Sequence, residues 1–337
     1  MIVGRTLRAV RRGRVEHVLP CISFVGVLIA FIVVPGLFGD EVNNGAIYTG
    51  MQGFAPLGLV ALALGLTLIG GEFDVSVLGM QALGGVVAVK AGAHSGLAGV
   101  AAGVAACALI GALQGALIAR LRLQSLAVTI GTYIALLGLT NVIASNNTLT
   151  YGNLSASVWV DQTILTWFSP RSLITVGAFA VVFALLGATR LGPELKAIGS
   201  DRRAARVSAI PIERRVIALF TCSAALAGLA GALLAYSNAS ASLDPGLQPL
   251  ILGVAAAVLG GLSLSGGRGT VWGLLLGTLA VALLEQLFAI TALSSSTTQI
   301  VFGGLLLAVV SADAPDLRMK MTGFAVRHRH ATRAEQP

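Results

Sequence analysis

Long runs of apolar residues follow one another along this chain of 337 residues, separated by short polar segments or glycine pairs. A helix of about 20 apolar residues crosses a bilayer with its backbone groups hydrogen-bonded internally. A membrane barrel would show short alternating segments instead. The pattern predicts an all-α membrane protein with about ten transmembrane helices, near 18–38, 51–69, 75–93, 96–118, 125–146, 170–189, 216–237, 247–263, 269–289 and 296–312.

The basic residues predict how these helices are oriented. Cytoplasmic segments of membrane proteins attract Lys and Arg. With ten spans, all of the 22 basic residues except Lys90 and Arg171 fall on the side of both termini. We therefore expect a basic cytoplasmic N-terminus at 1–17, a transmembrane domain at 18–312 and a basic cytoplasmic tail at 313–337.

Composition agrees with a multi-pass protein of the plasma membrane. Charged residues make up 11% of the chain and its mean hydropathy is +0.88, whereas soluble domains contain roughly 25% charged residues. The net charge of +8 is explained by topology, so we expect no nucleic-acid partner and contact with membrane lipid.

Two glycine-containing breaks, GGEFDVSV at 70–77 and GGLSLSGG at 260–267, interrupt short apolar runs in the two halves of the chain. Such paired breaks indicate a transport pathway, because unwound backbone at membrane depth must be buried or line a cavity. Thr129 and Thr132 share a helix face and could join this pathway, or bond back to their own helix. The candidate pathway or gate residues are Gly70, Gly71, Asp74, Ser76, Thr129, Thr132, Gly260, Gly261 and Ser263.

Three acids in or near the apolar runs have two interpretations each. Glu72 and Asp74 could shape a gate, but we favour caps at the membrane interface, where acids suit a helix N-terminus. Glu285 could touch a polar solute or reach toward the headgroups.

A charged segment at 190–215 interrupts the apolar pattern and contains AIGSDRRAARVSAI. The spacing predicts a helix over 200–210, with Ser200 as its N-cap and Pro211 ending it. One face of this helix would carry the basic side chains of Arg202, Arg203 and Arg206. The opposite face, the small face, would carry the short side chains of Ala204, Ala205 and Ser208. The small face suits the close approach of a cytoplasmic partner, whereas a loop that binds only lipid headgroups is the alternative.

Signals of enzymatic chemistry are nearly absent. No GxxxxGK(S/T) motif is present, so the chain has no P-loop for ATP hydrolysis. The four histidines lack metal-ligand spacing, and we expect neither a metal nor a cofactor. The three cysteines lie in apolar runs as packing residues.

Four segments resemble motifs of the membrane permeases of bacterial ABC importers of the ribose/monosaccharide type. AIGSDRRAARVSAI is similar to their coupling loop, A-(I/V)-G-G-N-x-x-A-A-R-L-S-G-I, and GGEFDVSV to G-G-(I/E)-(F/D)-D-L-S-V-G. VLGGLSLSGGRGTVWG resembles V-(L/I)-G-G-T-S-L-x-G-G-x-G-T-V-x-G, and SLAVTIGT a segment ending in V-T-L-G-T. The matches occur in family order over nearly the whole chain.

The resemblance implies a permease subunit without ATPase activity, paired with a second permease subunit, identical or different. It also implies two ATP-binding subunits in the cytoplasm and a solute-binding protein outside. The residues that match or flank the ATPase-coupling loop are Gly199, Asp201, Arg202, Ala204, Ala205, Arg206 and Ser208.

Three departures from the family pattern leave the solute open. Ala209 and Leu78 stand where the family has glycine, and Gln248–Ile251 replaces an acidic stretch before the second break. Branched-chain amino acids and nucleosides are the alternative solutes within this superfamily. An ion-coupled secondary transporter is the alternative mechanism, but it would require mid-span acids that the sequence does not place convincingly.

Overall fold

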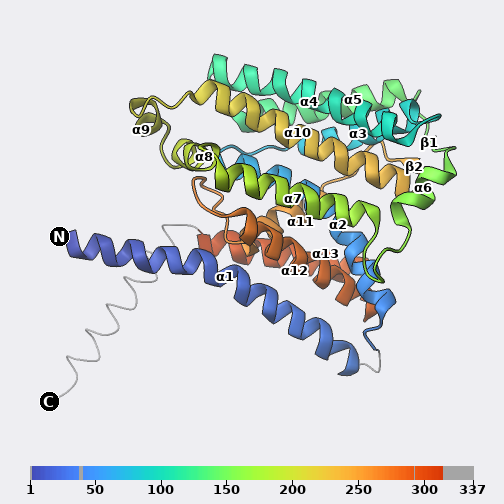
Figure 1. The fold of residues 1–337 in the computed structure, drawn as a ribbon, viewed down its shortest axis with the longest axis horizontal. Coiled ribbons are helices and arrows are strands. Elements are labelled where there is room, and N and C mark those ends of the chain that lie inside the picture. The colour runs from blue at the N-terminus through green and yellow to red at the C-terminus, as the bar shows by residue number, and fades with distance from the viewer. Residues whose placement is uncertain (1, 38–40, 292, 314–337) are drawn as a thin grey trace.

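The computed structural model describes residues 2–37, 41–291 and 293–313 of the chain. These residues form thirteen helices and one two-stranded antiparallel sheet, and Figure 1 labels them. The longer helices are α1 (Ile2–Leu37), α2 (Asn44–Ile69), α3 (Val77–Ala91), α4 (Gly96–Leu121), α5 (Ser125–Ile143), α7 (Pro170–Ala188), α10 (Ile212–Ser237), α11 (Gln248–Leu259), α12 (Val271–Ile290) and α13 (Ser295–Asp313). The shorter elements are β1 (Leu149–Thr150), α6 (Leu154–Asp161), α8 (Leu191–Ser200), α9 (Arg202–Val207) and β2 (Ser240–Ala241).

Each of the ten expected spans coincides with one of the longer helices, so the all-α class is confirmed. Among the described residues, seven helices are long and apolar enough to cross a membrane: α1 from Pro20 onward, α2, α4, α5, α7, α10 and α12. Helices α3 and α11 are apolar but shorter. Ten crossings and the side of the termini therefore stay predictions, and the expected basic tail beyond Asp313 lies outside the described residues.

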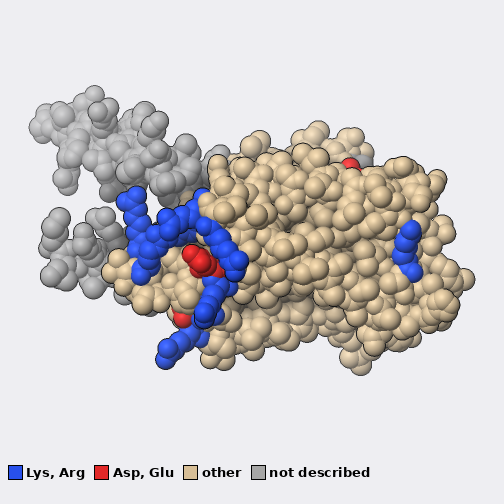
Figure 2. Space-filling view, turned by 90° about the horizontal axis from the view of Figure 1, so that it is seen from above, with Lys and Arg blue, Asp and Glu red and all other residues tan. Residues whose placement is uncertain are grey.

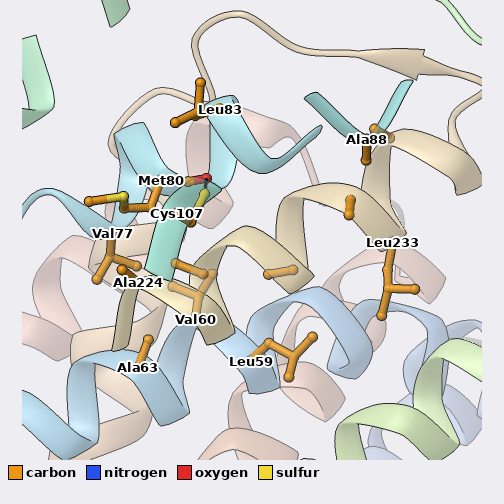
Figure 3. Packing of buried hydrophobic residues seen from close by; sticks show 14 of the residues in the cluster. Leu59, Val60, Ala63, Val77, Met80, Leu83, Ala88, Cys107, Ala224 and Leu233 are labelled. Carbon is orange, nitrogen blue, oxygen red and sulfur yellow. Dashed lines mark hydrogen bonds between the residues drawn. The ribbon is translucent and has the colours of Figure 1, made fainter. Parts of the chain in front are cut away.

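Helix α2 lies at the centre of the bundle and is almost entirely buried. It packs against α10, α12, α11 and α7, while α10 also packs along α4 and α3. Figure 3 shows part of this core, where side chains such as Val60 of α2, Met80 of α3 and Ala224 of α10 gather around Cys107 of α4. The Cys107 thiol donates to the backbone carbonyl of Met80 at 3.2 Å.

Glycines permit the closest helix contacts, and α4 carries four of them at a spacing of four residues in two pairs, Gly99 with Gly103 and Gly111 with Gly115. A Cβ added at Gly103 of α4 would lie 2.6 Å from the carbonyl oxygen of Gly84 in α3. One added at Gly111 would lie 2.5 Å from the carbonyl oxygen of Phe220 in α10. Real Cβ atoms do not approach so closely, so these glycines set the spacing of the helices.

Basic residues at the end opposite α8 and α9 are few, and Arg171 there is not simply a lipid-facing charge. Its side chain is buried and forms an ion pair with Asp161, with Nε and Oδ1 2.7 Å apart. The same guanidinium donates to the amide oxygen of Gln52 at 2.5 Å. This network joins α2, α6 and α7 beside the small β1–β2 sheet.

Candidate functional site

The two glycine-containing breaks have the same local structure. Helices α2 and α11 are each followed by two glycines, and the second of each pair has a left-handed backbone, Gly71 (φ +75°) and Gly261 (φ +78°). In the first break, the amide of Glu72 donates to the carbonyl of Thr67, five residues back, at 2.9 Å, and the second break repeats this bond at the same distance. Both ends are Schellman caps, for which glycine is preferred because it adopts positive φ without strain.

Both breaks meet helix α8 at one point, which we call the glycine junction: Gly71, Gly199, Gly266 and Gly267. A Cβ added at Gly199 would lie 2.2 Å from the carbonyl oxygen of Ile69 and 2.6 Å from the amide of Gly267. A Cβ added at Gly266 would lie 2.5 Å from Gly71 Cα. The amide of Gly267 also donates to the carbonyl of Ile69 at 3.1 Å. Backbone thus touches backbone, with no side chain between the three segments.

Ion pairs tie the charged segment to this junction. The guanidinium of Arg202, at the start of α9, donates to the carboxylate of Glu72 in the first break. The Glu72 side chain is only 5% exposed, whereas that of Arg202 is 43% exposed. Arg215 of α10 pairs with Glu194 of α8. Helices α8 and α9 are therefore linked both to the first break and to α10.

The expectation of a single helix over 200–210 is wrong, because the segment forms two helices that meet at Asp201. Asp201 has an extended backbone (φ −159°), and its carboxylate accepts from the amides of Arg203 at 2.7 Å and Ala204 at 3.1 Å. Asp201, and not Ser200, is thus the N-cap of α9, as expected of an acid that satisfies two free amides. Helix α9 ends at Val207, before Ala209, whose φ of +56° explains why the related loops have glycine there.

The expected small face of this segment is only partly open. Ala204 and Ser208 are exposed, and so are the expected basic residues Arg202, Arg203 and Arg206. Ala205, however, is 2% exposed, so its methyl group packs inside the chain and cannot lie on an open docking face. The outermost apolar side chain of α9 is that of Val207, which is 90% exposed.

The charged residues gather at the end of the molecule that carries α8 and α9. Figure 2 shows Lys and Arg of the described residues concentrated there around a small acidic patch, while the rest of this face is nearly free of charge. Figure 1 places α8 and α9 at the same end, where α7 ends and α10 begins. This charged end suits contact with water more than a hydrocarbon environment.

Asp74 is the most buried charged residue of the first break, with 1% of its surface exposed. Its carboxylate accepts from the amide of Ser76 at 3.0 Å, as a cap near the start of α3 would. It also accepts from the Ser76 hydroxyl, from Ser223 of α10 at 3.2 Å and from Gln114 of α4 at 3.4 Å. Asp74 therefore acts as a cap near the start of α3 and is also a buried acceptor that joins this end of α3 to α4 and α10. Its position at the membrane interface stays a prediction.

Sequence reasoning missed Gln114 and Ser223 as parts of this site. Each is a polar residue within a long apolar helix, and polar groups in such helices usually bond across to a neighbour. The sequence shows these polar residues but does not show which residue each one contacts. Asp74 lies 40 positions from Gln114 and 149 positions from Ser223.

The hydroxyl groups of the two threonines both bond to backbone carbonyls, and only Thr129 contacts the first break through such a bond. Thr129 is fully buried, and its hydroxyl bonds to the carbonyl of Leu126 at 3.2 Å and to that of Phe73 at 3.4 Å. Thr132 bonds back to the carbonyl of Val128 at 2.9 Å. Ser76 and Ser263, one in each break, are both buried. No group of His, Cys, Asp and Glu among the described residues could hold a metal ion.

Comparison with known proteins gives consistent relatives. The chain is 30% identical to the L-arabinose ABC transporter permease protein AraH of Azospirillum brasilense, over 76% of each chain. It is 28% identical to the fructose import permease protein FrcC of Rhizobium meliloti, over 88% of this chain and 84% of that protein. It is 28% identical to the ribose import permease protein RbsC of Escherichia coli K12, over 86% of this chain and 92% of that protein.

No solved structure matches the chain. A family profile described as "Branched-chain amino acid transport system / permease component" matches residues 46–310. The resemblance to importer permeases is thereby confirmed, and with it the role of a multi-pass transport component whose ATP is hydrolysed by another subunit. The chain belongs to this family of membrane permease components of ABC transport systems.

Proposed function

We propose that the chain forms the inner-membrane translocation path of a bacterial ABC importer for a monosaccharide-like solute. The similarity over most of the chain to permeases named for L-arabinose, fructose and ribose carries this proposal. The assembly would contain a second permease subunit, identical or different, ATP-binding subunits at the end that carries α8 and α9, and a solute-binding protein on the opposite side.

The glycine junction supports a route for coupling. A displacement of α8 and α9 would reach both breaks at once, because Gly199 lies against Gly71 and Gly267 with no side chain between them. The coupling residues proposed from sequence would then act in two groups. Arg202, Ala205 and Gly199 would transmit the movement inward, while Ala204, Arg206 and Ser208 would meet the ATPase, with Asp201 holding the cap between α8 and α9.

The ten-span topology with both termini in the cytoplasm belongs to this proposal. It is supported by ten helices at the expected positions and by the gathering of basic residues at the end of α8 and α9. In this arrangement the breaks, with Gly70, Asp74, Ser76, Gly260 and Ser263, open or close the cytoplasmic end of the path. Thr129 would support the first break through its bond to Phe73, and Thr132 would line the path only after rearrangement.

The direct test is solute uptake into proteoliposomes that contain this chain with its ATP-binding subunit and its solute-binding protein. Uptake of D-ribose, L-arabinose or D-fructose that requires ATP on the side of the ATP-binding subunit would support the proposal. The second candidate is a branched-chain amino acid importer, which the description of the matching family favours. ATP-dependent uptake of L-leucine without any of the sugars would establish that alternative, and uptake by this chain alone under an ion gradient would establish a secondary transporter.

A further inference from the structure

A half-open cavity of about 250 Å³ lies within the bundle, between α2, α3, α10, α11 and α12. Most of its lining is apolar, from leucine, valine and proline side chains of α2, α10 and α11. Its polar lining consists of the side chains of Gln81, Gln248 and Glu285. A mostly apolar cavity with a few polar groups is typical of sites that bind small molecules. Since a water molecule occupies about 30 Å³ of liquid, this volume exceeds what a single ordered water needs.

Gln81 of α3 carries a buried hydrogen-bond acceptor without a partner among the described residues. Its side chain is 4% exposed, and its amide oxygen has no hydrogen-bond partner among the residues that the structure describes. A buried acceptor without a partner costs about 1–3 kcal/mol, so such groups are normally satisfied. Gln81 borders the cavity, and although its amide oxygen is buried in this conformation, rotation of the amide would turn it toward a hydrogen-bond donor inside the cavity.

Glu285 of α12 and Gln248 of α11 form the other polar part of the lining and are hydrogen-bonded to each other through their side chains. Gln248 falls in the segment that replaces the acidic stretch usual in related permeases. In this chain the carboxylate at the cavity comes instead from Glu285 of α12. Of the two interpretations of Glu285 from sequence, the geometry favours contact with a polar solute.

The charge of the lining separates two classes of solute. No Lys or Arg is among the described residues that line the cavity, and Glu285 is its one acid. The ammonium group of an amino acid can pair with Glu285, but its carboxylate would meet no Lys or Arg in this lining, and burying an unpaired charge is costly. Neutral hydroxyl groups meet no such penalty, because they donate to carboxylate and amide oxygens.

We propose that this cavity is a solute-binding site within the permease, and that Gln81 and Glu285 accept hydrogen bonds from the hydroxyl groups of a small neutral polyol. Gln248 orients the Glu285 carboxylate and adds an amide beside it. This inference rests on the proposed function and deepens it, since it gives the permease a recognition step of its own after release from the solute-binding protein.

The first experiment measures uptake of D-ribose, L-arabinose and D-fructose by the reconstituted complex with Gln81→Met or Glu285→Leu. Each substitution removes an acceptor, and we expect uptake at limiting sugar to fall about tenfold, since a hydroxyl left unpaired in the cavity costs about one hydrogen bond. The conservative variants Gln81→Glu and Glu285→Gln keep an acceptor and should retain more of the uptake. Gln286→Met, on the adjacent position of α12 but outside the lining, is the matched control.

The second experiment detects occupancy without transport. In a chain with Cys21, Cys107 and Cys222 replaced by alanine, the Gln81→Cys variant is labelled in the assembled complex with a small water-soluble thiol reagent. We expect a transported sugar to slow labelling at least threefold and L-leucine to leave it unchanged. This measurement also decides the matter if Gln81→Met or Glu285→Leu does not assemble.

The outcomes distinguish the two proposals. If the wild-type complex transports a sugar while the acceptor-removing variants match Gln286→Met and the sugar leaves labelling of the Gln81→Cys variant unchanged, the cavity proposal is overturned and the importer function stands. If the wild-type complex transports L-leucine and no sugar, and L-leucine protects the introduced thiol, both the solute class and the polyol proposal are overturned.

Discussion

The backbone of Gly71, in the first break, lies directly against that of Gly266, in the second: a Cβ at Gly266 would be 2.5 Å from Gly71 Cα and 3.0 Å from the carbonyl oxygen of Gly199. The two breaks come from different halves of the chain, yet they share this contact and the same Schellman cap. Since packed backbone transmits displacement more directly than flexible side chains, the breaks and α8 should move together.

The glycine junction should not tolerate a methyl group. Gly266→Ala adds a Cβ against the Gly71 backbone and also places alanine at φ +84°, a strained conformation that costs about 1–3 kcal/mol. We expect lower thermal stability of the purified chain and ATP hydrolysis that is poorly coupled to solute uptake. Gly138→Ala in α5, where a Cβ would meet nothing within 4 Å, is the matched control. Wild-type coupling in Gly266→Ala would show that the contact plays no part in transport.

The ion pair between Glu72 and Arg202 should contribute to coupling more than to stability. Glu72 is buried and Arg202 is nearly half exposed, so solvent screening limits the pair to about 1 kcal/mol. We expect Arg202→Ala and Glu72→Gln each to reduce the solute transported per ATP hydrolysed, and the double variant to be no worse than either alone. Arg120→Ala, an exposed position at the same end with no ion pair among the described residues, is the control. Additive effects of the two substitutions would contradict a shared role.

The helices and the breaks could be predicted because their causes are local. Each apolar run is long enough to form a helix by itself, and the pairs Gly70–Gly71 and Gly260–Gly261 mark helix ends in sequence. The lengths were less accurate: α2 begins at Asn44 and not near 51, because its polar first turn is capped by Asn43 and does not have to be apolar.

The contacts of the site could not be predicted, because they join distant residues. The helical pattern over 200–210 predicted a basic face and a face of small residues, and the small face was expected to meet a cytoplasmic partner. Ala205 instead packs inward, and Arg202 of the same helix pairs with Glu72, which lies 130 positions away in the sequence. From the sequence, Asp74 was likewise predicted to be a simple cap. Its bonds to Gln114 of α4 and Ser223 of α10 follow only from the packing of these helices.

The buried Asp74 should be a main source of stability for the first break. Asp74→Ala would leave Gln114, Ser223 and the Ser76 amide without their acceptor, at about 1–3 kcal/mol for each donor left unpaired. We expect the thermal midpoint of the detergent-purified chain to fall by several degrees. Asp244→Ala, which removes an exposed acceptor near the start of α11, should have a smaller effect. Equal midpoints for the two variants would show that the network contributes little.

Helix α9 should bind the ATP-binding subunit through its outer surface and not through Ala205. Val207 is 90% exposed at the end of α9, where we propose that the ATP-binding subunit docks, and the cores of protein interfaces are depleted in charged residues. We expect Val207→Asp to weaken retention of the ATP-binding subunit in a pull-down from membranes, with normal insertion and normal thermal stability of the permease.

Two further variants separate docking from internal packing. Val158→Asp changes a valine that is 68% exposed on α6, at the opposite end, and should retain the ATP-binding subunit fully. Ala205→Trp must displace neighbouring residues of its own chain, since Ala205 is 2% exposed, so it should lower the thermal midpoint of the isolated permease as well as transport. If Ala205→Trp instead abolishes docking at unchanged stability while Val207→Asp docks normally, the buried face of α9 turns outward in the complex, and the assignment of its two faces is reversed.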